Sequence, residues 1–213
     1  MGDRTTVVRL RQHVNPLSRR FQQEVAVPDW SRIYAIASQP LHLDIGSARG
    51  TFLLQMAALH PEQNFLGLEI RYPLVVAANE RRDRHGLLNL HYLWGNANAH
   101  LGRLLQGVPL QTVSIQFPDP WFKRRHHKRR VVTPDLVATL AQHLCPGGRV
   151  ILQSDVLEVA VAMVQQFRAH PAFAASPPDW LPQSPWPVTT EREQYVLAQG
   201  LPVYRWQGVL LRP

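Results

Sequence analysis

The stretch LHLDIGSARG, residues 41–50, decides how the rest of the sequence is interpreted. A short apolar run ends at Gly46, and an amphipathic stretch begins at Thr51. Gly46 and Gly50 surround the turn between them, where missing side chains let a ligand approach the backbone and the amino end of a helix. The stretch therefore predicts a strand, a ligand-binding turn and a helix in succession.

The same alternation of apolar runs and amphipathic stretches continues to residue 170. It is typical of βαβ units and predicts a parallel sheet in an α/β fold. We expect strands at residues 41–46, 64–70, 89–96, 112–117, 148–155 and 203–211. We expect helices at residues 51–60, 73–85, 99–105, 134–144 and 157–170. Residues 171–187 hold six of the 18 prolines, which predicts an irregular segment.

Length and charge set the organisation of the chain. The 213 residues are 45% hydrophobic and predict one globular domain, residues 41–213, preceded by a basic extension at residues 1–40. A formal charge of +8 indicates a polyanionic partner, either a nucleic acid or an anionic membrane surface. Residues 123–130 contain six Lys or Arg and no acid, so without them the formal charge falls from +8 to +2.

Cysteine content and hydropathy indicate the compartment. The single cysteine, Cys145, excludes an intramolecular disulfide and a cysteine-based zinc cluster, which fits a reducing compartment. No apolar run approaches the roughly 18 residues that a membrane-spanning helix needs, and no signal-peptide pattern opens the chain. We therefore expect a cytoplasmic protein that neither spans a membrane nor binds a metal.

Polar side chains follow five successive predicted strands. In an open parallel sheet, ligands bind at the carboxyl ends of the strands, near the point where the strand order reverses. The residues at these ends are Asp44, Gly46, Glu69, Asn96, Asn98, Asp119 and Asp155. Glu69 follows the glycines by about 20 residues, where an acid accepts hydrogen bonds from a ribose diol. The set predicts a nucleoside-bearing cofactor.

Some of these polar positions have a second interpretation. Asn96 fits adenine recognition and a helix cap equally well, whereas Asn98 is better explained as a cap. The segment TERE, residues 190–193, is typical of a capping box formed by Thr190 and Glu193. On its own, that pattern gives the segment no function.

The stretch FPDPWFKRRHHKRR, residues 117–130, combines a carboxylate, aromatic rings and a cationic run. Prolines on both sides hold Asp119 in an extended position at a strand end. Trp121 and Phe122 offer surfaces on which a base can stack, and the cations after them can hold phosphates. Most charge runs are solvated faces or localisation signals. This one lies between a strand and a helix, at the predicted ligand-binding edge, which favours a role in an active site.

These motifs together resemble a known family. The order of the motifs is that found in the bacterial tRNA (guanine-N(7)-)-methyltransferases, over about residues 41–210. The motifs are LDIGSARG, LGLEIR, GNAN, FPDPWFKRRHHKRR, GGRVILQSD and TERE. The resemblance implies the Rossmann-like fold of class I methyltransferases, a mostly parallel seven-stranded sheet with helices on both faces. It also implies the cofactor S-adenosylmethionine, a tRNA substrate and methylation of guanine 46 in the variable loop.

The resemblance also implies roles for single residues. Those that match the family's cofactor-binding positions are Asp44, Glu69, Asn96 and Asp119, to which the glycine loop adds Gly46. Asp119 also matches the active-site carboxylate. The substrate-binding positions are matched by Lys123, Asp155, Thr190, Glu191, Arg192 and Glu193. Two residues depart from the pattern: Asp44 stands where many members have Glu, and Ala48 where many methyltransferases have the middle glycine of the loop.

The implied reaction needs no general base, because guanine N7 has an in-plane lone pair and no proton. Asp119 is then expected to position the reactants and to stabilise the positive charge that develops on the purine. One alternative is a non-catalytic RNA-binding protein on a degenerate Rossmann-like scaffold, which would not bind the cofactor. A nicotinamide-dependent oxidoreductase is disfavoured by the basic loop and by glycine spacing that departs from G-x-G-x-x-G.

Overall fold

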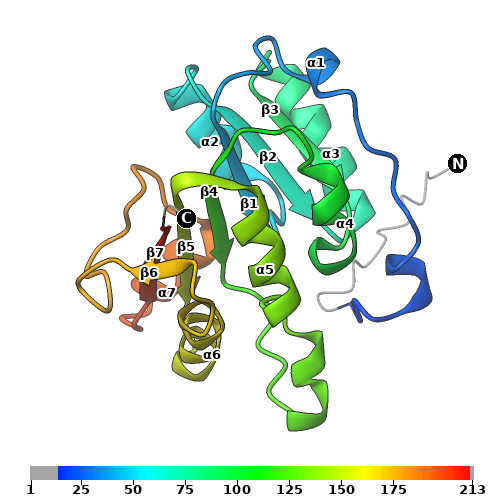
Figure 1. The fold of residues 1–213 in the computed structure, drawn as a ribbon. Coiled ribbons are helices and arrows are strands. Elements are labelled where there is room, and N and C mark those ends of the chain that lie inside the picture. Colours follow the sequence, from blue (N-terminus) through cyan, green and yellow to red (C-terminus); the bar gives the residue numbers. More distant parts are fainter. Residues whose placement is uncertain (1–13, 212–213) are drawn as a thin grey trace, which may run out of the picture.

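The computed structural model describes residues 14–211. Arg4, Arg9 and Arg11 of the predicted basic extension lie outside the described residues. The described chain forms one seven-stranded sheet in the order β3-β2-β1-β4-β5-β7-β6 (Figure 1). The strands are β1 (Leu41–Ile45), β2 (Asn64–Glu69), β3 (Leu90–Trp94), β4 (Leu110–Gln116), β5 (Leu144–Ser154), β6 (Phe173–Ala175) and β7 (Tyr204–Leu210). Strand β7 is antiparallel to β5 and β6, whereas the other neighbours pair in parallel.

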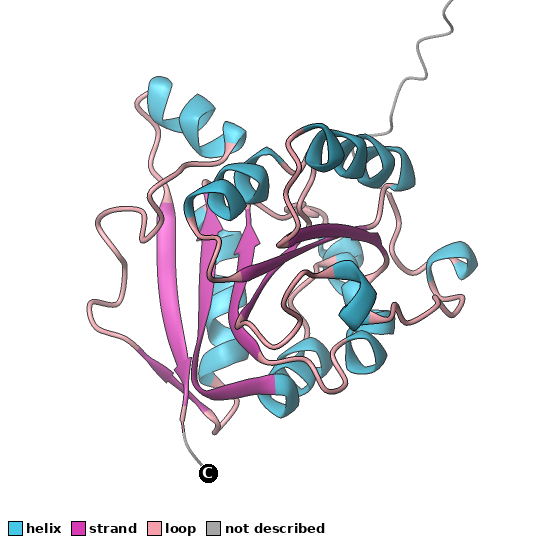
Figure 2. Ribbon diagram, turned by 90° about the horizontal axis from the view of Figure 1, so that it is seen from above, coloured by secondary structure: helices cyan, strands magenta, loops and turns pink. Residues whose placement is uncertain are grey.

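Helices cover both faces of the sheet (Figure 2). They are α2 (Thr51–Leu59), α3 (Tyr72–Arg84), α4 (Ala97–Leu104), α5 (Pro134–His143), α6 (Leu157–Arg168) and α7 (Glu191–Ala198). Helices α2 and α3 pack on one face, and α4, α5 and α6 pack on the other. The sheet therefore separates two hydrophobic cores, one on each face. Phe65 and Leu66 of β2 are both fully buried, but Phe65 belongs to one core and Leu66 to the other. The predicted mostly parallel seven-stranded sheet with helices on both faces is confirmed.

Several elements differ from the predicted ranges, and three of these differences have a clear local reason. Strand β5 begins at Leu144 rather than at residue 148, because Leu144 already pairs with Leu110 of β4, ahead of a register shift. The proline-rich segment contains the short strand β6, which pairs with β7. Helix α4 begins at Ala97 rather than at residue 99, because Asn96 caps it.

Residues 14–40, predicted as part of a basic extension, pack against the sheet domain. They form a short 3-10 helix, η1 (Arg19–Phe21), and a short helix, α1 (Trp30–Ile33). The indole N–H of Trp30 donates to the Leu104 carbonyl at 3.2 Å. Tyr34 is buried, and its hydroxyl donates to the Phe65 carbonyl at 3.0 Å. These contacts make the segment part of the larger hydrophobic core.

The strand order reverses between β1 and β4. From β1 the chain proceeds outward through β2 and β3, and it then returns to the other side of β1 to form β4 and β5. Such a reversal opens a crevice at the carboxyl ends of the two central strands. Within residues 14–211, no helix has the length and apolar character that crossing a bilayer requires.

Candidate active site

A cavity of about 640 Å³ lies at the carboxyl ends of β1, β2 and β4. The predicted site residues that line it are Asp44, Gly46, Glu69, Asn96, Asp119, Asp155, Thr190, Glu191 and Arg192. Lys123 and Glu193 are the two predicted site residues that do not line it. The fold thus brings together side chains that are spread over most of the sequence.

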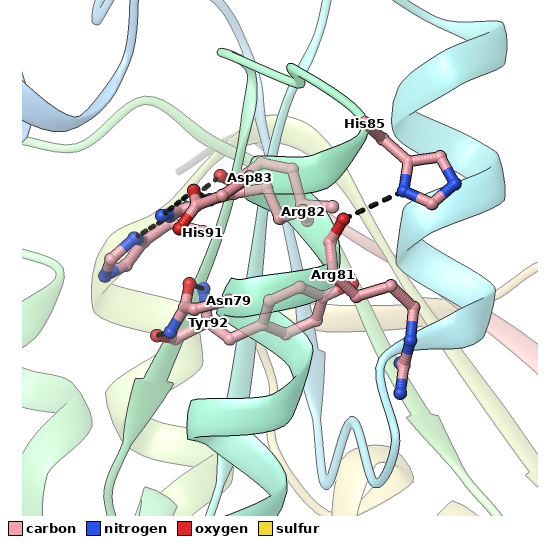
Figure 3. Close-up of polar contacts among 8 residues, drawn as sticks. Asn79, Arg81, Arg82, Asp83, His85, His91 and Tyr92 are labelled. Atoms are coloured by element: carbon pink, nitrogen blue, oxygen red, sulfur yellow. Dashed lines mark hydrogen bonds and ion pairs between the residues drawn. The ribbon is translucent and has the colours of Figure 1, made fainter.

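The glycine loop between β1 and α2 has three residues with positive φ. Gly46 has φ 85°, Ala48 has φ 50° and Gly50 has φ 76°. A Cβ at Gly50 would lie 2.5 Å from the ring of Tyr92, and the Tyr92 hydroxyl donates to the Gly50 carbonyl. Figure 3 shows Tyr92 held in turn by Asn79 of α3, whose amide donates to the Tyr92 carbonyl at 2.7 Å. The conformation of the glycine loop therefore depends on the contacts of Gly50 with Tyr92 of β3.

Asp44 lies at the end of β1 and is only 4% exposed. One carboxylate oxygen, Oδ1, accepts hydrogen bonds from the Ser114 hydroxyl at 2.6 Å and the Gln116 amide at 3.2 Å. Burial raises the pKa of Asp44 from 3.8 to about 6, against the lowering effect of these bonds, and the charge of Glu69 raises it further. No cation of the described chain pairs with this carboxylate. A buried carboxylate of this kind is suited to a cationic ligand.

Glu69, at the end of β2, is 2% exposed and holds the glycine loop in place. Its carboxylate accepts from the backbone N–H of Ala48 at 2.9 Å. It also accepts from the backbone N–H of Arg71 at 2.9 Å and from the Arg71 guanidinium at 2.8 and 3.2 Å. Four bonds match the number that a carboxylate can accept. To accept from a ribose hydroxyl, Glu69 must therefore exchange one bond, and the Arg71 side chain is the group that can move.

Asn96 follows β3 and caps α4, because its side-chain oxygen accepts from the Asn98 N–H at 3.2 Å. Its amide donates to the carbonyls of Pro16 at 3.1 Å and Phe21 at 3.2 Å. Asn96 thus ties the amino-terminal segment to the cavity. The prediction that Asn98 is the cap is wrong, since Asn98 lies inside α4 and its amide donates to the Val131 carbonyl at 2.8 Å.

The segment after β4 carries Asp119 into the cavity between two strained residues. Phe117 has φ 49° and Trp121 has φ 45°, a left-handed conformation that is unfavourable for bulky side chains. The Phe117 N–H donates to the Gln153 carbonyl of β5 at 2.8 Å. The charge of Asp119 also acts on Arg71. Burial lowers the pKa of Arg71, but the hydrogen bond and the charge of Glu69, together with the charge of Asp119, raise it above its usual value.

The cationic run forms a 3-10 helix, η2 (Arg124–Arg129), which lies in the segment that projects below α5 in Figure 1. Lys123 is its exposed N-cap residue and stands outside the cavity. Arg129, in contrast, lines the cavity, and its guanidinium lies 5.0 Å from the centre of the Trp121 ring. The run is therefore divided between an exposed cationic surface and residues that turn toward the cavity.

The amino end of α7 closes another side of the cavity. Arg192 forms an ion pair with Asp155, the residue that follows β5. Glu191 lies 3.5 Å from the guanidinium of Arg49 in the glycine loop. Thr190 caps α7 by accepting from the Glu193 N–H at 3.1 Å, which is one of the two bonds of the predicted capping box. The second bond is not formed, because the Glu193 carboxylate binds Arg205 instead. These contacts join the TERE segment to both the glycine loop and the end of β5.

Glu193 points away from the cavity. Its side chain is fully buried and forms an ion pair with Arg205 of β7, in which the shorter N–O distance is 2.7 Å. One oxygen, Oε2, has no hydrogen-bond partner among the described residues. This arrangement gives Glu193 a structural contact, and the TERE pattern alone did not reveal it.

The sequence interpretation missed several cavity residues. Arg71 was not singled out, although its position two residues after Glu69 at the same strand end was an available signal. Val14 and Pro16 also line the cavity, and the amino-terminal segment has no periodic pattern that could have placed them there. Within residues 14–211, no group of three or more His, Cys, Asp or Glu side chains is arranged to hold a metal ion.

Solved structures share this fold at low sequence identity. The 16S rRNA methyltransferase KamB superposes with a TM-score of 0.63 at 16% identity, covering 90% of this chain and 98% of that chain. A variant of the 16S rRNA (adenine(1408)-N(1))-methyltransferase from Catenulisporales acidiphilia, solved with cosubstrate SAM, superposes with a TM-score of 0.60 at 15% identity and covers 91% of this chain and 96% of that chain. The fold is thus that of these methyltransferases.

Sequence comparison is more specific. The profile of the family described as "Putative methyltransferase" matches residues 38–206. A tRNA (guanine-N(7)-)-methyltransferase of Thermosynechococcus vestitus is 77% identical over 207 residues, covering 97% of both chains. The protein of the same name from Microcystis aeruginosa is 55% identical over 202 residues, covering 93% of this chain and 96% of that protein. The chain belongs to the family of tRNA (guanine-N(7)-)-methyltransferases.

Proposed function

We propose that this protein transfers a methyl group from S-adenosylmethionine to N7 of guanine 46 in the variable loop of tRNA. The observation that carries the proposal is the convergence of two carboxylates, Asp44 and Asp119, on one cavity beside the cationic helix η2. Because the proposed substrate is tRNA, the proposal includes a cytoplasmic location for the reaction.

The cavity residues fit S-adenosylmethionine. The cavity has a volume of about 640 Å³, which lies within the range of cofactor sites. No heavy atom lies within 4 Å of the position that a Cβ would take at Gly46, so a ligand can approach the loop backbone there. The cofactor has a positively charged sulfur and an ammonium group, and Asp44 offers a buried carboxylate that no cation of the described chain neutralises. Glu69 offers a carboxylate to the ribose once Arg71 gives up a bond.

S-adenosylmethionine supplies a methyl group on its sulfonium, which a nucleophile can attack directly. The lone pair of guanine N7 forms the new N–C bond, and the electron pair of the broken C–S bond stays on sulfur. The positive charge therefore passes to the purine, and no proton has to be removed. Asp119, held between two prolines at the end of β4, is placed to orient the base and to stabilise that charge.

The exposed part of the cationic run is the surface we propose for tRNA. Lys123, Arg124, Arg125 and Lys128 are all exposed on or next to η2. Phosphate contacts of this kind give affinity that falls steeply with salt, but they carry little sequence information. The choice of one guanine must therefore come from the shape of the tRNA and from contacts within the cavity.

The experiment is to incubate the purified protein with tRNA and methyl-labelled S-adenosylmethionine and to map the modified nucleotide. The proposal expects one labelled N7-methylguanine per tRNA at position 46, and no label when that guanine is replaced by adenine. Binding of tRNA without methyl transfer would instead identify a non-catalytic RNA-binding protein. Label at another nucleotide would reject the assignment of position 46.

A further inference from the structure

The last residue of the cationic run, Arg130, is placed differently from the cations before it. Its side chain is 14% exposed, whereas Arg124 and Arg125 are exposed. Its Nε donates to the Pro120 carbonyl at 3.1 Å. Its Nη2 donates to Glu158 of α6 at 2.6 Å and lies 3.2 Å from Nε2 of His127. Together these contacts hold the guanidinium against the segment that carries Asp119 and against α6.

The Pro120 carbonyl belongs to the residue directly after Asp119. The segment from Phe117 to Trp121 begins and ends with a strained residue, at φ 49° and φ 45°. Such conformations persist only where the surroundings hold them. One end is held by the bond from the Phe117 N–H to β5 at 2.8 Å. The guanidinium of Arg130 provides the bond near the other end.

The two groups that Arg130 joins lie on separate elements. Glu158 is in the first turn of α6, and Pro120 is in the segment that follows β4. The planar guanidinium can serve both at once because its donors have a fixed fork geometry. The hydrogen bond from Arg130 lowers the pKa of Glu158 below its usual value.

We infer that Arg130 is a positioning residue, which fixes the backbone beside Asp119 against α6, and that it does not bind tRNA phosphates. This inference rests on the proposed function, because it assigns Asp119 to methyl transfer. It divides the cationic run by role: the exposed cations bind tRNA, and Arg130 holds the segment that carries the carboxylate.

The test compares two variants that each remove one positive charge, Arg130→Met and Arg124→Met. For Arg130→Met we expect kcat to fall between about 10-fold and 100-fold, since displacement of a reacting group by about 1 Å has effects of this size. The Kd for tRNA and its salt dependence should stay within about twofold of wild type. For Arg124→Met we expect a weaker Kd for tRNA and a salt slope lower by about 1.

Two further variants keep the inference testable if Arg130→Met folds poorly. Arg130→Lys retains one donor and should restore part of the lost kcat. Glu158→Ala should lower kcat without weakening tRNA binding, and the double variant of Arg130→Met and Glu158→Ala should lose no more than Arg130→Met alone. A phosphate contact would behave differently, because removing Glu158 would release Arg130 and tighten tRNA binding.

Hydrogen exchange gives a readout that does not depend on activity. The backbone amides of Phe117, Asp119 and Trp121 should exchange faster in Arg130→Met than in wild type or in Arg124→Met. A weaker Kd with unchanged kcat, or unchanged exchange in this segment, would overturn the inference. Absence of methyl transfer by the wild-type protein would instead reject the proposed function, and the exchange experiment would still decide the role of Arg130.

Discussion

The hydroxyl of Ser114 joins Asp44 to His42 in the centre of the sheet. It donates to the Asp44 carboxylate at 2.6 Å, and Nε2 of His42 lies 2.9 Å from it. Because the only hydroxyl proton goes to Asp44, Ser114 accepts from His42. Burial, with smaller effects from the charges of Arg149 and His60, lowers the pKa of His42 to about 3, so the ring is neutral. Asp44 is thus held by neutral donors, and no cation among residues 14–211 compensates its charge.

Replacing Asp44 by Asn should stabilise the cofactor-free protein at neutral and higher pH. Asp44 has a pKa of about 6 in the folded state, against an ordinary value of 3.8. The folded state therefore binds this proton more tightly than the unfolded state, and the free energy of unfolding falls as pH rises from about 4 to about 6. We expect Asp44→Asn to be more stable than wild type at pH 8 by on the order of 2 kcal/mol. The difference should vanish near pH 4. Urea denaturation at the two pH values measures it, and a variant that is less stable at pH 8 would contradict the prediction.

Cofactor affinity should depend on the ionisation of Asp44. A cationic ligand binds the ionised carboxylate, so the affinity for S-adenosylmethionine should rise between pH 5 and pH 7, by up to about tenfold per pH unit below the pKa. Calorimetric titration over this range measures it. Asp44→Asn should bind more weakly and show no such rise. An equal pH dependence in the variant would mean that another group is responsible.

The glycine loop offers a test of backbone strain at Ala48. Its φ of 50° is a left-handed conformation that costs about 1 kcal/mol or more for a residue with a Cβ. Ala48→Gly removes this cost but loses part of the gain to the flexibility of glycine in the unfolded chain. We expect a net stabilisation of about 0.5 kcal/mol by thermal unfolding. The matched control is Gly46→Ala, where the new Cβ meets no atom within 4 Å and should destabilise by about 1 kcal/mol.

Two neighbouring glutamates of α7 should differ strongly in their contribution to stability. Glu193 pairs with Arg205 where both side chains are buried, so Glu193→Ala leaves an unpaired buried cation and should cost about 3 kcal/mol or more. Glu191 pairs with Arg49 where both are exposed, and Glu191→Ala should cost less than about 1 kcal/mol. Denaturant unfolding of both variants decides this. Similar losses would show that the buried pair has no special role.

Much of the fold could be predicted because the central strands are buried on both faces and form continuous apolar runs. Turns rich in glycine and proline mark their ends, and the carboxyl ends carry the polar residues. Strand β6 was missed because three residues among many prolines give no period, and its pairing with β7 depends on contacts distant in the sequence. Residues 14–40 were missed as part of the domain for the same reason, since Trp30 and Tyr34 are anchored by carbonyls far along the chain.

The candidate site could be predicted at the level of strand ends but not at the level of single bonds. Glu69 was expected to face a ribose, yet its oxygens are engaged by Ala48 and Arg71. Glu193 was expected to complete a capping box, but its carboxylate binds Arg205, which only the folded chain shows. The cationic run was treated as one feature. The contacts of Arg129 with Trp121, earlier in the same stretch, and of Arg130 with Glu158 of α6 are visible only in the folded chain.

The central claim is that Asp119 acts on methyl transfer itself and not on the binding of tRNA. The most direct test is the single-turnover rate of Asp119→Asn with saturating tRNA and S-adenosylmethionine, together with the Kd for tRNA. The loss of a preorganised charge that faces the developing cation predicts a rate lower by about 100-fold, with the Kd within about twofold of wild type. A wild-type rate in the variant, or a loss explained entirely by weaker tRNA binding, would contradict the claim.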